Sequence, residues 1–314
     1  MNSGKIFVER NKNNVFEEVE INDLRNSSHP EYGPLFYNDV QQYLNQAIAQ
    51  NGLSASNIGI YDYVENTKND LVELGSIEHF YHLLGQAKGI LKYRLKHGKS
   101  TFNRYQNHSY ETLEVLKIRG LFKIQGKIYW AVNGTARLEL IHSVNKLCME
   151  ITNPSVLEAG CGSGLNIYLL NKLNGKIDIH GFEYTNARLA SSLANLWDSK
   201  AKDNLFLADI CDLNLEDNSY DVVYTNHVLE QLGQEKAELA LKEIWRVCKK
   251  GIVVCEPSIH GANLYEKWRM KTLGYCEDLL VIANSFEDAE ISTYKEDDIR
   301  YYPNTSYHLI VKKN

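Results

Sequence analysis

Three glycines stand at alternate positions in the run V-L-E-A-G-C-G-S-G, residues 156–164, and one carboxylate, Glu158, precedes them. Glycine accepts positive φ angles and lets the backbone turn sharply and come close to a ligand. A pyrophosphate-binding fingerprint needs its third glycine at position 165, where this chain has leucine. Glu158 would also repel a pyrophosphate, because both groups are negative. The run therefore indicates a ligand that carries an amino group and a sulfonium.

Two further acids follow apolar runs downstream. Glu183 comes 23 residues after Gly160, where a carboxylate can accept hydrogen bonds from both hydroxyls of a ribose. Asp209 stands in the run L-A-D-I, where its side chain can accept from the exocyclic amine of adenine while Ile210 packs on the ring. The three acids together fit a ligand with an amino-acid end, a ribose and an adenine.

The second half of the chain has the pattern that would position these residues. Apolar runs of strand length alternate with helical spacing, which predicts a mostly parallel sheet covered by helices on both faces. The expected strands cover 155–159, 176–183, 204–209, 220–226, 251–257 and 306–313, and the expected helices cover 165–173, 186–199, 235–248 and 262–273. Ligands of such sheets bind beyond the carboxyl ends of the strands, where Glu183 and Asp209 are expected.

In this order, the features resemble the class I S-adenosylmethionine-dependent methyltransferases, especially the group with a V-L-E-H signature. The segments that carry the resemblance are VLEAGCGSG (156–164), Glu183, Asp209-Ile210, YDVVYTNHVLEQL (220–232) and EIWRVCKKGIVV (243–254). Two positions depart from the group: Gln231 replaces its histidine, and Lys249-Lys250-Gly251 replaces K-P-G-G. The resemblance implies a Rossmann-like sheet, mostly parallel with an antiparallel last strand.

The resemblance also implies S-adenosyl-L-methionine as the cofactor. The cofactor-binding residues that it implies are Glu158, Gly160, Cys161, Gly162, Gly164, Glu183, Tyr184, Asp209, Ile210 and Asn226.

Three residues at strand ends are candidates for catalysis: His227, Glu256 and His260. Methyl transfer is an in-line displacement from an activated donor, so the protein mainly aligns the reactants, and a base such as histidine helps when the acceptor is a hydroxyl. The alternative for His227 is that it packs beside the cofactor as a loop residue. Glu256 and His260 could instead share a divalent metal with a third acid, but two ligands do not make a metal site and none is expected.

The first part of the chain has a different pattern. Residues 34–97 have helical apolar spacing, residues 110–119 predict a helix, and Gln125-Gly126 divides two alternating runs, which predicts a hairpin. We therefore expect residues 1–140 to form a mainly helical cap or lid for the substrate, or a dimer surface. Residues 141–314 would form the methyltransferase domain.

The charge of the chain is segregated. Residues 86–137 carry eleven Lys and Arg against two Glu, a local charge of +9 in a chain of net charge −6. Such a block is a solvated face or a docking surface for an anionic partner. The favoured function is methyl transfer to a hydroxyl of a polar small molecule, or of a glycan- or nucleotide-linked intermediate, including phosphorylated ones. The alternatives are an RNA or protein methyltransferase that uses residues 86–137, a non-catalytic cofactor-binding scaffold, and a nicotinamide dehydrogenase.

Composition bounds the remaining classes. With 44% hydrophobic and 24% charged residues, the chain has the composition of a globular protein. It contains no run of about 20 apolar residues of the kind that spans a membrane, and its first residues have no signal-peptide pattern. Its six cysteines include no C-x-x-C pair, which favours reduced, buried thiols. The sequence therefore predicts a cytoplasmic protein.

Overall fold

The computed structural model describes the methyltransferase-like half of the chain almost throughout and the N-terminal half in parts. The residues described are 5–9, 16–20, 72–98, 119–124, 127–132, 138–162, 164–185, 188–189, 192–193, 196, 200–295, 300–302 and 307–314. The helices expected within residues 34–71, over 110–118 and over most of 186–199 lie outside these ranges.

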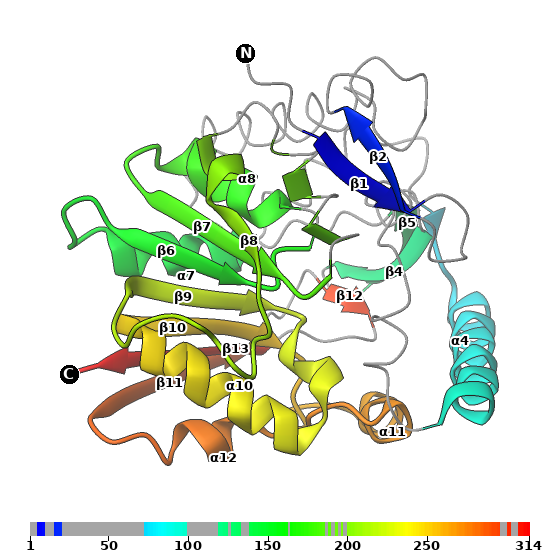
Figure 1. Ribbon diagram of the computed structural model, residues 1–314. Coiled ribbons are helices and arrows are strands. Elements are labelled where there is room, and N and C mark those ends of the chain that lie inside the picture. The colour runs from blue at the N-terminus through cyan, green and yellow to red at the C-terminus, as the bar shows by residue number, and fades with distance from the viewer. Residues whose placement is uncertain are drawn as a thin grey trace.

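A seven-stranded sheet forms the centre of the molecule (Figure 1). Its strands are β6 (Ser155–Ala159), β7 (Asp178–Glu183), β8 (Leu205–Leu207), β9 (Tyr220–Asn226), β10 (Cys248–Glu256), β11 (Ala289–Lys295) and β13 (Tyr307–Lys313), in the spatial order β11-β13-β10-β9-β6-β7-β8. The five strands from β6 to β10 are parallel, and β13 runs antiparallel to both β10 and β11. The Rossmann-like sheet with an antiparallel last strand is confirmed, and the edge strand β11 is an addition to the sequence prediction.

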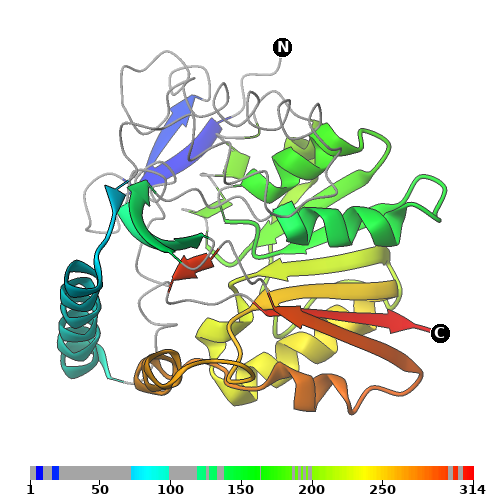
Figure 2. The same ribbon diagram turned by 180° about the vertical axis from the view of Figure 1, so that it is seen from behind.

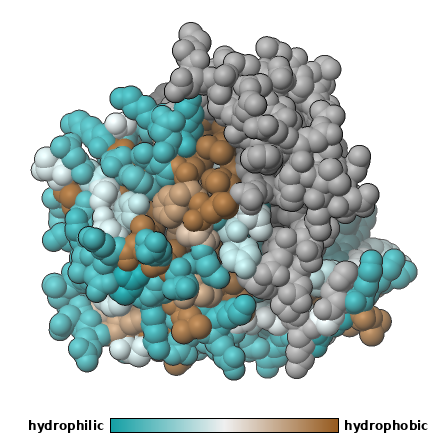
Figure 3. Space-filling model, viewed as in Figure 1, coloured by the Kyte–Doolittle hydropathy of each residue, from teal (hydrophilic) through white to brown (hydrophobic). Residues whose placement is uncertain are grey.

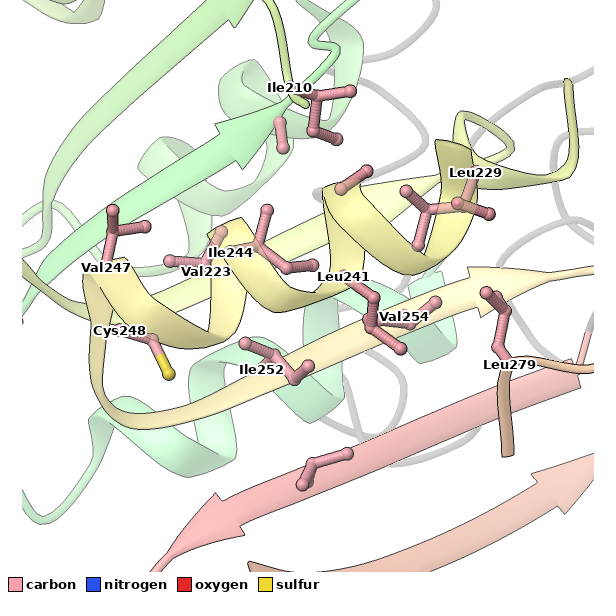
Figure 4. Close-up of a cluster of buried hydrophobic side chains, with 14 of the residues drawn as sticks. Ile210, Val223, Leu229, Leu241, Ile244, Val247, Cys248, Ile252, Val254 and Leu279 are labelled. Atoms are coloured by element: carbon pink, nitrogen blue, oxygen red, sulfur yellow. The ribbon is translucent and has the colours of Figure 1, made fainter. Parts of the chain in front are cut away.

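Helices cover both faces of this sheet. On one face α7 (Leu138–Cys148) and α8 (Leu165–Leu173) pack in a buried cluster that includes Val156, Val222 and Tyr224. On the other face α10 (Gln234–Val247) and α12 (Leu279–Ala283) bury Leu157, Val223 and other side chains of the alternate strand positions (Figure 4). The period of two along each strand divides its side chains between these layers, so neighbouring residues enter different cores.

Packing explains the glycine in Lys249-Lys250-Gly251, the segment that replaces K-P-G-G of the resembled group. A Cβ at Gly251 would lie 2.6 Å from the carbonyl oxygen of Val311. Glycine therefore lets β13 approach β10 at the start of their antiparallel register, where Gly251 faces Lys312.

The described parts of the first half contain two small sheets and a long helix. Strand β1 (Lys5–Glu9) pairs with β2 (Phe16–Glu20), and β3 (Val72–Glu73), β4 (Arg119–Ile124) and β5 (Lys127–Val132) form a second sheet with β12 (Arg300–Tyr302) in the order β12-β4-β5-β3. The antiparallel pairing of β4 and β5 confirms the expected hairpin. Since β12 comes from residues 300–302, the second sheet joins both halves of the chain, and the division at residue 140 stays a prediction.

The long helix α4 (Ser76–His97) packs beside α11 (Leu264–Leu273). Ile90 and Tyr93 of α4 contact a small buried cluster on α11, and the hydroxyl of Tyr265 donates to the carbonyl of Leu83 at 3.2 Å. The opposite side of α4 exposes large apolar side chains, among them Ile77, Phe80, Tyr81, Leu84, Leu91 and Leu95. The expected helix is confirmed here, but Ile77, Phe80 and Leu84, which share its expected apolar stripe, do not face the core.

Both views place the four-stranded sheet beyond the carboxyl ends of β6 and β9, with α4 and α11 on the same side (Figures 1 and 2). This is the side of the central sheet where the predicted site residues lie. No helix of the described residues is long and apolar enough to cross a bilayer. All six cysteines are unpaired thiols, and all but Cys211 are buried.

Candidate functional site

The loop after β6 uses glycine at three positions that other residues would occupy with strain. Gly160, Gly162 and Gly164 have φ angles of +75°, +55° and +75°. A Cβ at Gly160 would lie 2.6 Å from Cγ2 of Val228, and one at Gly164 would lie 2.8 Å from Cδ1 of Leu196. The turn that the spacing predicts is therefore present, and the absence of a Cβ at Gly160 and Gly164 lets Val228 and Leu196 pack directly against it.

Glu183 connects the end of β7 to this loop. The N–H of Gly162 donates to its Oε1 at 2.5 Å, and the N–H of Tyr184 donates to its Oε2 at 3.1 Å. Nη1 of Arg188 lies 3.6 Å from Oε2. The buried carboxylate is thus fixed against the glycine turn, and each of its oxygens can accept a second hydrogen bond.

Two predicted cofactor residues beside this pair differ in exposure. Cys161 is buried, with its Sγ 3.4 Å from Oγ of Ser192, whose hydroxyl also donates to the carbonyl of Gly162. Tyr184 has 44% of its surface exposed. Cys161 therefore supports the loop from inside, whereas Tyr184 lies at the surface next to Glu183.

Glu158 points into the core rather than out of the loop. Nδ2 of Asn166 donates to its Oε1 at 2.8 Å, and the hydroxyl of Tyr224 donates to its Oε2 at 3.0 Å. The pKa of Glu158 is raised to about 8, because burial and the nearby charge of Glu183 outweigh the opposing effect of these two hydrogen bonds. The assignment of Glu158 to the amino end of the cofactor stays a prediction, since both of its oxygens accept hydrogen bonds from side chains between α8 and the sheet.

Asp209 and Ile210 follow β8 and differ in exposure, and their assignment to the adenine stays a prediction. Asp209 is exposed, and its Oδ1 accepts from the N–H of Cys211 at 2.9 Å, while Ile210 is buried at the rim of the α10-side cluster (Figure 4). A hydrophobic patch lies over the β8 side of the face shown in Figure 3, and Leu207 on β8 is half exposed. An exposed acid beside apolar surface fits a flat heterocycle with an amine.

The end of β9 carries Asn226 and His227. Within the described part of the chain, Oδ1 of Asn226 is a buried acceptor without a hydrogen-bond partner. His227 has a φ of +56°, its N–H donates to the carbonyl of Cys255 at 3.0 Å, and its Nδ1 lies 3.3 Å from Oε2 of Glu230. The carboxylate of Glu230 thus holds the imidazole through one ring nitrogen.

Glu256, at the end of β10, is buried and surrounded by hydrogen-bond donors. Its Oε1 accepts from the hydroxyl of Thr225 at 3.1 Å and from the N–H groups of Val228 and Leu229 at 2.8 and 3.1 Å. Its Oε2 accepts from the N–H of Glu230 at 3.1 Å. Burial, followed by the charge of Glu230, raises the pKa of Glu256, and the N–H groups of Val228, Glu230 and Leu229 oppose this rise because they stabilise the carboxylate. This geometry gives no support to the predicted contact of Glu256 with the methyl-accepting substrate, because both of its oxygens accept hydrogen bonds from Thr225 and from the loop after β9.

His260 lies further along the same connection and is more open. Its Nε2 is 3.0 Å from Oδ2 of Asp278, its backbone N–H donates to Oγ of Ser258 at 3.2 Å, and 41% of its side chain is exposed. Oδ1 of Asp278 caps α12 by accepting from the N–H of Val281. The cap fixes the carboxylate, and the carboxylate fixes the imidazole.

The structure brings the loops after β6, β7, β9 and β10 together through Gly160–Val228, Gly162–Glu183 and Val228–Glu256 contacts. The side chain of His260 instead contacts Asp278, and that of Asp209 accepts from the N–H of Cys211. The sequence analysis missed Asn166, Tyr224 and Asp278 as partners of site residues. A tyrosine inside the buried run YDVVYTN was a usable signal, since a buried hydroxyl requires a partner. In the described ranges, no three His, Cys, Asp or Glu side chains lie close enough to hold a metal ion.

Comparison with known proteins agrees with this arrangement. Residues 157–255 match the family described as a methyltransferase domain. O-methyltransferase 3 of Dictyostelium discoideum is 29% identical over 132 residues, which are 39% of this chain and 30% of that protein. The chain thus spans less than a third of the length of this relative.

Solved structures of similar fold include two methyltransferases. Magnesium protoporphyrin IX methyltransferase from Synechocystis PCC 6803 with bound SAM is 16% identical, with a TM-score of 0.41 over 56% of this chain and 78% of that one. A SAM-dependent methyltransferase from Aquifex aeolicus is 15% identical, with a TM-score of 0.42 over 58% and 94%. Class I methyltransferases use S-adenosylmethionine as the methyl donor. Residues 157–255 therefore match a methyltransferase domain, and the sheet around them has the Rossmann-like fold that the resemblance to the class I methyltransferases predicts.

Proposed function

We propose that this chain transfers the methyl group to a hydroxyl of a polar small molecule, or of a glycan- or nucleotide-linked intermediate, including phosphorylated ones. The observation that carries the proposal is the pair of imidazoles that follow β9 and β10. His227 lies against Glu230 and His260 against Asp278, each through one ring nitrogen. A histidine oriented by a carboxylate is suited to remove a hydroxyl proton near neutral pH.

The residues around the glycine loop fit S-adenosylmethionine. A Cβ at Gly162 would have Oε1 of Glu183 as its nearest neighbour, at 3.9 Å, so the turn leaves room at this position for a ligand that lies directly on the backbone. The unpartnered Oδ1 of Asn226 suits an amino group, and the second lone pairs of Glu183 suit ribose hydroxyls. The exposed Asp209, two residues after the half-exposed Leu207, suits adenine. When bound, the cofactor supplies an activated methyl group.

The acceptor side is proposed to lie between these loops and the second sheet. There, the task of the chain is to align the hydroxyl and to take its proton. We assign the base to His260 before His227, because the imidazole of His260 is more exposed, 41% against 16%. In this assignment Asp278 stabilises the charged imidazole, as a carboxylate does for a catalytic histidine. The name of the Dictyostelium relative, an O-methyltransferase, supports a hydroxyl acceptor.

Transfer of labelled methyl groups into a cell extract tests the proposal. With the purified chain and radiolabelled S-adenosylmethionine, we expect label in a solvent-extractable or glycan fraction. His260→Asn should reduce that transfer about 100-fold, the lower range for loss of a general base, while calorimetric affinity for S-adenosylmethionine stays unchanged.

The other outcomes separate the alternatives. Label in RNA or protein, with binding that weakens steeply with salt, would favour a macromolecular acceptor that docks on the basic segment, of which Lys88, Lys92 and Lys96 are exposed on α4. S-adenosylmethionine binding without transfer into any fraction would favour a non-catalytic scaffold.

A further inference from the structure

The backbone of the loop after β9 converges on one buried carboxylate. Three consecutive N–H groups, those of Val228, Leu229 and Glu230, donate to Glu256 at 2.8, 3.1 and 3.1 Å. The hydroxyl of Thr225, near the end of β9, donates to the same side chain at 3.1 Å. Glu256 is 2% exposed, so protein donors and not water surround it.

These N–H groups have no partner within their own short helix. Val228 precedes the 3-10 helix η4 (Leu229–Leu232), and the first N–H groups of a helix lack acceptors in the helix itself. A buried N–H without a partner is unfavourable, so three of them would destabilise the loop strongly. The two carboxylate oxygens of Glu256, on the neighbouring strand β10, accept all three of these hydrogen bonds.

The same loop determines where His227 lies. His227 has the left-handed φ of +56°, a strained conformation for a residue with a Cβ. Bonds on both sides maintain it: its N–H donates to Cys255, its carbonyl accepts from Nε2 of Gln231 at 2.8 Å, and the next N–H, of Val228, donates to Glu256. Its imidazole then lies against Glu230, whose own N–H is on Glu256.

The loop also reaches the cofactor side. Val228 covers Gly160 so closely that a Cβ there would lie 2.6 Å from its Cγ2. One anchored loop therefore carries both the imidazole proposed for the acceptor side and the side chain that closes over the glycine turn.

We propose that Glu256 is a positioning residue, whose carboxylate anchors residues 227–230 and thereby sets the placement of His227 and the seating of Val228 on Gly160. This inference deepens the proposed function and rests on it for the role of His227. Glu256 contacts neither cofactor nor acceptor in this account; it acts through the loop.

The carboxylate has chemistry that an amide cannot replace. Two oxygens accept from three N–H groups and one hydroxyl, whereas glutamine has one oxygen, and its NH2 group would face a donor. Glu256→Gln should therefore release at least one of the three N–H groups. Glu256→Asp keeps both oxygens but withdraws them by one methylene, so it should restore part of the anchoring.

Hydrogen exchange and NMR on the unliganded protein test the anchor without activity. We expect the amides of Val228, Leu229 and Glu230 to exchange at least about 10-fold faster in Glu256→Gln, and the ring signals and titration midpoint of His227 to move. Glu256→Asp should lie between this variant and the wild type. Thr225→Val is the matched control, because it removes one donor to Glu256 and leaves the three loop N–H groups bound.

Activity then separates positioning from direct participation. We expect a kcat about 10–100-fold lower in Glu256→Gln, with the KM for S-adenosylmethionine changed less than about threefold, since a displaced His227 aligns the acceptor hydroxyl less well while His260 remains the base. Loss of activity with unchanged amide exchange and unchanged His227 signals would overturn the inference and assign Glu256 to the substrate. Failure of the wild type to bind S-adenosylmethionine would instead refute the proposed function and leave the exchange result as the measure of the anchor. If Glu256→Gln does not fold, Glu256→Asp carries the same comparison.

Discussion

The loop after β6 and the loop after β9 meet where Val228 covers Gly160, yet they are held in different ways. The glycine loop owes its shape to what is absent: three positions with positive φ have no Cβ, and its contacts to Glu183 and Phe182 come from its own backbone. The loop after β9 contains a left-handed histidine, and a carboxylate on another strand holds it.

This difference separates what each loop tolerates. A loop shaped by missing side chains fails when a side chain is added inside it. A loop held by a distant carboxylate fails when that carboxylate changes, and its own side chains have more freedom. Substitutions in each loop should therefore affect different steps, cofactor binding for the first and acceptor chemistry for the second.

The largest expected effect is that of Gly160→Ala. The new Cβ combines a φ of +75° with a 2.6 Å approach to Val228. We expect the affinity for S-adenosylmethionine, measured by calorimetry, to fall about 100-fold, because strain and overpacking of this kind each cost about 1–3 kcal/mol.

Gly251→Ala is the control for this variant. Its Cβ would meet the carbonyl oxygen of Val311 at 2.6 Å, on β13 and away from the glycine loop. It should lower the free energy of unfolding while the folded fraction binds the cofactor normally. Equal affinity losses in both variants would mean that the effect of Gly160→Ala is general destabilisation.

A second substitution should recover part of the loss. Val228→Ala removes both methyl carbons that a Cβ at Gly160 would meet, at 2.6 and 3.1 Å. In Gly160→Ala/Val228→Ala we expect the loss of affinity for S-adenosylmethionine to shrink to about 10-fold. The remaining loss reflects the left-handed φ, which costs about 1–2 kcal/mol. The calorimetric double-mutant cycle measures this coupling. Strict additivity of the two variants would show that the loops do not act on each other.

The smallest expected effect concerns stability and pH. Burial raises the pKa of Glu158 to about 8, so between about pH 4.5 and 8 the folded chain retains a proton that the unfolded chain has lost. The free energy of unfolding therefore falls as pH rises through this range. In Glu158→Gln, the free energy of unfolding, measured by urea denaturation, should fall over this pH range by on the order of 1 kcal/mol less than in the wild type.

Glu243→Gln provides the opposite sign. Hydrogen bonds from Arg246 lower the pKa of Glu243, so its contribution to stability is present above its unfolded pKa and is lost as pH falls. This variant should lose stability at neutral pH without changing the slope between pH 5 and 8. An unchanged slope in Glu158→Gln would contradict the burial of that carboxyl.

The parts that could be predicted from sequence are those with local causes. Strands β6 and β9 and helix α8 match their expected ranges because apolar runs and the glycine stop signals lie within each segment. The glycine turn was predictable for the same reason. Edge strand β11 was not, because its run AEISTYK has little apolar patterning and gains its place by pairing with β13.

The roles of the two buried glutamates depend on contacts that are distant in sequence. Glu158 is two residues from Val156, so the period of two sends it into the layer of α8 and toward Tyr224, 66 residues away. The donors to Glu256 lie 26–31 residues earlier in the chain. A carboxylate at a strand end looks the same in sequence whether it faces a ligand or a loop.

The central claim is that the glycine loop and Glu183 together form the binding site for S-adenosylmethionine. Calorimetric titration of the wild type and of Glu183→Gln tests it most directly, with Asp178→Asn at the opposite, exposed end of β7 as control. We predict that the wild type and Asp178→Asn bind alike and that Glu183→Gln binds about 10–30-fold more weakly, the loss of a charge-assisted hydrogen bond. Absence of binding by the wild type, or equal binding by Glu183→Gln, would contradict it.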